Sequence, residues 1–176
     1  NVKGWEFDDS GDLQTGELKD VQFDPNAQSS AQVTEDISIG GNLSADLSAD
    51  DSETTSISSV VYDDQGESKS VTVEFERIQS RDEGDGTDEW DFTVKDEEGS
   101  NLATGSIEFN VEGEITNITE PDGTVNNINP GDPDAKKYEA SFSWDLNDDG
   151  SDESLDLVFG DENGGSVTQY SGSTTA

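Results

Sequence analysis

One loop of the sequence has residue types and a spacing that suit metal binding. Asp145, Asn147 and Asp149 alternate before Gly150, and Asp156 stands at the twelfth position counted from Asp145. This is the spacing of a calcium loop, in which oxygen atoms supply roughly six to eight ligands. However, the flanking segments alternate like strands, and Asp is shorter than the Glu that closes such a loop in an EF-hand. A calcium site and an ordinary acidic hairpin loop therefore both stay open.

No other group of residues stands out as a catalytic site. The sequence has no His and no Cys, so the usual general base, the thiol nucleophile and any disulfide are absent. Two carboxylates suffice for a glycosidase, but 43 acidic residues produce pairs by chance, and no pair can be singled out. No phosphate-binding glycine loop opens a helix. We expect no enzyme, no small-molecule substrate and no cofactor other than calcium at the acidic loop.

The charge of the chain excludes two classes of partner. The 43 acidic residues face only 8 basic ones, which gives a formal net charge of -35. Nucleic acid and anionic membranes are excluded because both require clustered Lys and Arg. The acids are spread along the whole chain, which favours a halophilic protein that works in concentrated salt, where like charges are screened. An ordinary acidic secreted protein is the alternative.

Alternating apolar residues predict the strands that carry these loops. The clearest pattern is a hairpin, with strands at 57–62 and 68–78 and a turn at 63–66 closed by Gly66. Asp side chains in this turn are expected to bond the turn backbone. The residues expected to form the core of this hairpin are Val60, Tyr62, Val71, Val73 and Phe75.

The rest of the chain reads as further short strands with almost no helical periodicity. They are expected at 33–39, 90–94, 102–109, 115–118, 138–144 and 155–159, with loops or linkers at 24–31, 42–55 and 120–137. Four aromatic residues alternate within these strands and read as core rather than as a carbohydrate-binding platform: Trp90, Phe92, Phe142 and Trp144. The pattern predicts an all-β antiparallel sandwich or barrel, with a short second β segment from the N-terminal stretch and the tail.

A series of short motifs resembles, in its order, the central part of the bacterial flagellar hook protein family. The motifs are Gly4-Trp5 with Ser10-Gly11 and Leu18, then Asn42-Leu43, residues 59–66 and 70–75, Glu89-Trp90, residues 103–110, and Leu155-Asp156-Leu157 with Thr168-Gln169-Tyr170. No metal site follows from the resemblance. The chain begins at Asn1 and shows no signal peptide, and we expect it to be a piece of a longer protein without the family's terminal helical regions.

The resemblance implies an architecture and a mechanical function. Residues 1–40 would belong to or lead into the inner domain of the hook, residues 41–160 would form the outer β domain, and residues 161–176 would be a return segment. The implied function is that of a structural subunit of the extracellular hook, the flexible joint that passes motor torque to the filament. Its partners would be copies of itself in a helical tube. The alternative is a β-sandwich module of a salt-adapted cell-surface or adhesin protein, with calcium as a stabilising ligand.

Overall fold

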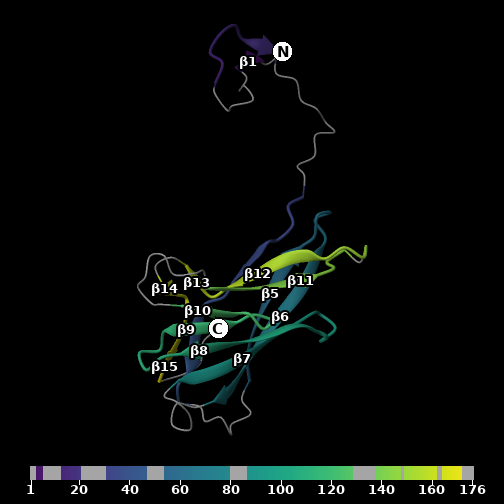
Figure 1. Cartoon of the computed structure of the whole chain (residues 1–176). Coiled ribbons are helices and arrows are strands. Elements are labelled where there is room, and N and C mark those ends of the chain that lie inside the picture. The colour runs from purple at the N-terminus through teal and green to yellow at the C-terminus, as the bar shows by residue number, and fades with distance from the viewer. Residues whose placement is uncertain are drawn as a thin grey trace. The chain divides into compact units, whose positions relative to one another are not determined.

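The fold is all-β throughout the part of the chain that the computed structural model describes. This part comprises residues 3–5, 13–20, 31–46, 54–79, 87–128, 138–147, 149–161 and 164–171. Its regular elements are all strands, which confirms the predicted fold class (Figure 1). None of its segments is a helix with the length and apolar character of a membrane span. The chain separates into two units, residues 1–30 and residues 31–176.

A small pair of strands lies within the described residues of the first unit. Strand β1 (Lys3–Gly4) pairs antiparallel with β2 (Lys19–Asp20). The Trp5 indole N–H donates a hydrogen bond to the Gly16 carbonyl at 3.1 Å, and half of the Trp5 surface stays exposed. Short strands were predicted here, and these two confirm that part of the prediction.

The second unit is built on a six-stranded antiparallel sheet in the order β10-β9-β8-β7-β6-β5. Consecutive strands are neighbours, so the sheet is a meander of hairpins that runs from teal to green in Figure 1. Its strands are β5 (Thr54–Tyr62), β6 (Ser68–Gln79), β7 (Asp88–Lys95), β8 (Asn101–Phe109), β9 (Ile115–Thr119) and β10 (Val125–Asn127). Strand β10 lies within the predicted loop 120–137, and that prediction is wrong at this point.

One kind of turn recurs within the described part of the meander. Gly66 adopts a φ of 82°, and its N–H donates to the Asp63 carbonyl at 3.1 Å. The Asp63 carboxylate accepts the N–H groups of Gln65 and Glu67 at 2.9 and 2.7 Å, which confirms the predicted role of Asp in this turn. The same backbone pattern recurs in three more turns, which begin at Asp96, Asn110 and Glu120 and reach Gly99, Gly113 and Gly123.

Smaller sheets accompany the meander. The three-stranded sheet has the order β11-β12-β3, in which β11 (Glu139–Trp144) is antiparallel and β3 (Asp36–Ser38) parallel to β12 (Glu153–Val158). A second parallel pair joins β4 (Gly41–Ser44) and β15 (Val167–Tyr170). A small hairpin joins β13 (Gly160–Asp161) and β14 (Gly164–Gly165).

Strand β4 corrects the prediction that residues 42–55 form a connection with little to bury. Leu43 is 3% exposed and belongs to the core. Its strand is held by β15, whose register sets Leu43 opposite Gln169. Because the partner strand lies far along the sequence, local composition could not reveal this pairing.

The core lies between the meander and the three-stranded sheet. The Phe159 ring, which follows β12, lies 5.5 Å from the ring of Phe92 and 6.5 Å from that of Phe75, between centroids. Trp90 and Phe92 are fully buried and Phe142 nearly so, which confirms that they are core residues. Trp144 is only partly buried, and the Lys69 ammonium lies 5.8 Å from the centroid of its ring.

The predicted core of the first hairpin is right in one strand and wrong in the other. Val71, Val73 and Phe75 on β6 are buried, as expected. On β5, however, Val60 and Tyr62 are 53% and 48% exposed, whereas Val61 is fully buried. Three consecutive apolar residues leave the inward face ambiguous in the sequence, and the pairing of β5 with β6 decides it.

Candidate functional site

The loop predicted as a calcium site joins β11 to β12 and is held by its own side chains. The two carboxylate oxygens of Asp145 accept the N–H groups of Asp149 and Gly150 at 3.0 and 2.9 Å. The Asn147 side-chain oxygen also accepts the Asp149 N–H, at 3.1 Å. Gly150 supplies the positive φ, 88°, with which the loop turns back. In this arrangement the side chains of Asp145 and Asn147 shape the loop.

Asp156 lies apart from the other three predicted ligands. It belongs to β12, and its carboxylate accepts the Ser141 hydroxyl at 2.6 Å from the neighbouring strand. Three residues of strand separate it from Glu153, which corresponds to about 10 Å. Glu153 takes the place nearer the loop, since its carboxylate accepts the Leu146 N–H at 2.9 Å. Glu153 was not among the predicted ligands, although its place at the ninth position of the calcium-loop spacing was a signal for it.

The calcium site stays a prediction. Within the described ranges, no group of three or more His, Cys, Asp or Glu side chains is arranged to hold a metal ion. Thermal unfolding with and without millimolar calcium in concentrated salt tests the site. A rise in Tm supports a calcium loop, and an unchanged Tm removes it.

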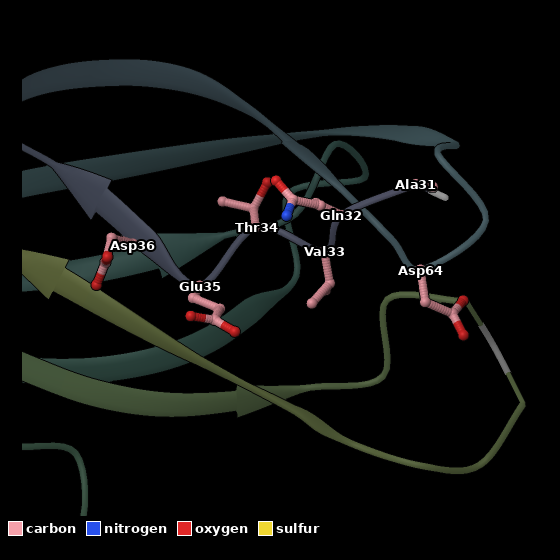
Figure 2. A pocket seen from close by; sticks show the side chains of 7 residues that line it. All are labelled: Ala31, Gln32, Val33, Thr34, Glu35, Asp36 and Asp64. Carbon is pink, nitrogen blue, oxygen red and sulfur yellow. The ribbon is translucent and has the colours of Figure 1, made fainter. Parts of the chain in front are cut away.

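A hollow lies beside β3, and one of its lining residues, Asp64, accepts a hydrogen bond from the Asn147 side chain of this loop at 3.4 Å. It encloses roughly 560 Å³. The residues that line it are Ala31, Gln32, Val33, Thr34, Glu35, Asp36 and Asp64. Figure 2 shows the carboxylates of Asp36 and Asp64 at opposite ends of the hollow, so its acidic groups do not converge on one point. The lining carries no cation that would bind an anionic ligand.

A buried polar network lies at the end of β6 and the start of β7. Arg77 and Asp88 are 4% and 0% exposed, and one terminal nitrogen of the Arg77 guanidinium, Nη2, donates to the Asp88 carboxylate. The other, Nη1, donates to the Ala45 carbonyl at 3.2 Å, just after β4. Arg77 continues the alternation of Val73 and Phe75 along β6, so its side chain lies on the same inward face. This alternation was the sequence signal for the burial of Arg77.

Gln169 of β15 completes this network. With its amide oriented to satisfy both neighbours, it donates to the second Asp88 oxygen at 2.9 Å and accepts the Trp90 indole N–H at 3.0 Å. The network therefore fastens β15, and through Ala45 the end of β4, to the six-stranded sheet. Its members hold strands together and form no open reaction centre.

The outer face of the sheet also carries an acidic group of residues. Burial raises the pKa of Asp91, and the nearby carboxylates of Glu89 and Glu76 raise it further. Glu89 accepts the Ser106 hydroxyl at 2.9 Å, while Glu74 pairs with the Lys95 ammonium. Together with the buried network, this arrangement fits a structural protein.

Comparison with known proteins identifies the family. A family model described as the flagellar basal body protein FlaE D2 domain matches residues 26–176. No curated protein matches the chain. The matched region contains both the six-stranded sheet and the three-stranded sheet that packs on it. The resemblance to the hook family is thereby confirmed, and the chain belongs to the family of the flagellar basal body protein FlaE D2 domain, a structural component of the flagellar hook.

Proposed function

We propose that this chain is the outer part of a hook subunit and that it helps the hook to act as a flexible joint, which passes motor torque to the filament outside the cell. The observation that carries the proposal is the match of the family over residues 26–176. The fold supports it, because hydrogen-bonded strands with an interlayer aromatic core make a stiff body. Its partners are copies of the same subunit in a helical tube.

The acidic surface supports a sliding contact between such copies. A net charge of -35 opposes tight, dry contacts between identical surfaces, and a bending tube requires neighbouring subunits to shift against one another. We propose that this surface works in concentrated salt, because salt shortens the range of the repulsion between like charges to a few ångströms. The assignment of residues 1–40 to the inner hook domain, 41–160 to the outer domain and 161–176 to a return segment stays a prediction.

Electron microscopy of the cells tests the proposal. An epitope inserted beside Gly99, in an exposed turn with open space around the glycine, would label the surface of the hook. Replacement of residues 31–176 by a short linker, in the gene that encodes this chain, should leave cells with impaired swimming. Label on another cell-surface structure, with swimming unchanged in the replaced strain, would contradict the proposal and favour the adhesin alternative.

A further inference from the structure

Residues 31–36 form a strap on the surface of the second unit, just before the chain enters the core. All six line the hollow beside β3, and Figure 2 shows their side chains along it. Four of them are exposed, and Val33, the one large apolar side chain of the strap, is only partly buried against the core. Ile37 and Ile39, which follow, are each 4% exposed. The chain therefore passes from loosely packed to fully packed residues at Ile37.

Few hydrogen bonds hold the strap. The Thr34 N–H donates to the Tyr62 carbonyl, and the Thr34 hydroxyl accepts the Tyr62 N–H, both at 2.9 Å. The Glu35 carbonyl accepts the Asp156 N–H at 2.8 Å, at the point where the parallel pairing of β3 with β12 begins. Among the residues that the structure describes, these are the hydrogen bonds that join the strap to the rest of the unit. The strap can therefore separate from its neighbours at a small local cost.

Like charges lie on both sides of the strap. In the register of β3 with β12, Asp36 stands opposite Asp156, and side chains at such positions lie on the same face of the sheet. Like charges that stand opposite each other on neighbouring strands are destabilising. Asp64, from the β5–β6 turn, lines the same hollow as Glu35. Because the strap itself carries no basic residue, its negative charges favour release.

We propose that the strap is detachable: its bonds to Tyr62 and Asp156 open and close, aided by its like charges, while the rest of the unit stays folded. A pull that arrives through residue 31 loads the two bonds between Thr34 and Tyr62 first and the bond of Glu35 next. Release stops at Ile37, because its buried side chain and the pairing that follows must move together. Six freed residues span up to about 20 Å, so release lengthens the link between Ile37 and residues 1–30.

An adjustable link suits a subunit of a bending tube. The distances between neighbouring subunits change as such a tube turns, and a detachable strap absorbs part of that change within one chain. This use of the strap rests on the proposed function, whereas its release is a property of the chain alone.

Amide hydrogen exchange of the full chain, followed by NMR, tests the release. The Thr34 and Ile39 amides both donate to a backbone carbonyl, at 2.9 and 2.8 Å. After correction for intrinsic rates, the Thr34 amide should nevertheless exchange about tenfold faster or more, because it needs only local opening. Equal protection of the two amides would overturn the proposal, since the strap would then open only with the whole unit.

Two variants with the same change of net charge test the repulsion. Asp36→Asn removes a negative charge opposite Asp156, whereas Glu112→Gln removes one from the exposed β8–β9 turn, at the other end of the meander from the β5–β6 turn. At low salt, Asp36→Asn should slow exchange at Thr34 relative to Ile39 by about twofold or more. Glu112→Gln should leave this ratio unchanged. Equal ratios in the two variants would contradict the role of the like charges.

Thr34→Val tests whether the strap opens separately from the core. The substitution removes the hydroxyl that accepts the Tyr62 N–H and keeps the size of the side chain. The amide of residue 34 retains its own acceptor, the Tyr62 carbonyl, but should exchange about threefold faster or more because the strap opens more often. Exchange at Ile39 and the urea midpoint should stay as in the natural chain. Faster exchange at Ile39 by the same factor would overturn the proposal.

Exchange in the isolated chain and labelling in cells separate the strap from the proposed function. If residue 34 exchanges only together with Ile39 but the labelled protein occupies the hook, the strap alone is wrong. If the strap opens locally but the label lies outside the hook, the proposed function fails and the detachable strap is upheld.

Discussion

Arg77 is one of only eight basic residues in the chain, and it is used inside the fold rather than on the surface. Both charges of a buried ion pair lose their hydration, which costs free energy. The pair therefore stabilises the fold only when its geometry is good and further hydrogen bonds satisfy its remaining polar groups. Here Asp88 receives the guanidinium on one oxygen and the Gln169 amide on the other. Asp88 is thus the centre of the contact between β6, β7 and β15.

Removal of this carboxylate should be far more costly than removal of a surface one. Asp88→Ala leaves the Arg77 charge buried without its partner and should lower the free energy of unfolding by about 3–5 kcal/mol. The control is Glu74→Ala, which breaks the partly exposed pair with Lys95 and should cost less than about 1 kcal/mol. Urea unfolding of both variants in the same salt measures the difference, and equal losses would show that the network is not specifically stabilising.

Asp91 predicts a pH-dependent gain in stability. Its pKa is raised in the folded protein, chiefly by burial and then by Glu89 and Glu76, so the folded state favours the protonated form. The charged form therefore weakens folding at neutral pH, and stability at this site increases as the pH falls through the raised pKa. Asp91→Asn should be more stable than the natural chain at pH 7.

The pH profile checks the cause. The advantage of Asp91→Asn should shrink as the pH falls and level off below the ordinary Asp value of 3.8, where both the folded and the unfolded natural chain are protonated at this site. An advantage that is constant from neutral to acidic pH would instead point to a packing effect of the amide.

For individual residues, the sequence predicted where the polar side chains lie better than it predicted which groups they bind. It placed Asp145, Asn147 and Asp149 in one loop, and the structure brings them together. It also placed Asp156 in the strand expected at 155–159, and the structure has it in β12, apart from the loop, although the spacing rule had counted it as the fourth ligand. Arg77 and Asp88 were missed because a charged residue in an acidic chain is expected to face water.

The strands of the meander depend on one close approach between neighbours. A Cβ added to Gly105 of β8 would lie 2.3 Å from the Thr119 carbonyl oxygen and 2.4 Å from the Phe92 ring. A backbone oxygen and a fully buried ring have little room to move away. Because Gly105 has no side chain, β8 can pack against the Phe92 ring and still remain paired with β9.

Gly105→Ala should accordingly destabilise the sheet. The strain of the extra methyl group should cost about 1–3 kcal/mol or more in the free energy of unfolding. Thr104→Ala, at the exposed neighbouring position, should change it by no more than about 0.5 kcal/mol. Denaturant unfolding followed by the intrinsic fluorescence of the three tryptophans measures both changes. An unchanged free energy of unfolding in Gly105→Ala would mean that the strands can move apart at this point without cost.

The strands that were predicted correctly are those whose sequence signals lie within a few residues of one another. Three hairpins of the meander, β5–β6, β7–β8 and β8–β9, follow from a period of two and from Asp or Asn three residues before Gly, and both signals lie within a few residues. The parallel pairs β3–β12 and β4–β15 were not predicted, because each joins segments more than a hundred residues apart. Strand β10 was missed since its one apolar residue, Val125, is half exposed and stands among turn formers.

At the scale of the whole molecule, stability should increase with salt. The net charge of -35 makes the compact state repel itself, and the screening length falls from about 10 Å at 0.1 M to about 3 Å at 1 M salt. Calorimetry from 0.1 to about 2 M KCl should show a rising Tm. A protein of similar size and near-zero net charge is the control, and a natural chain no more salt-sensitive than this control would contradict the prediction.

The parallel pairing of β4 with β15 also determines how the body resists a pull on its two ends. Strand β4 lies early in the chain and β15 late, and they run in the same direction in an unbroken register from Gly41–Val167 to Ser44–Tyr170. Tension applied through residue 31 and residue 171 would drag the two strands lengthwise past each other. All the bonds between them would then share the load in shear instead of opening one by one, as in a zipper. A pair of strands loaded in this way resists separation more strongly than a pair whose bonds open one after another.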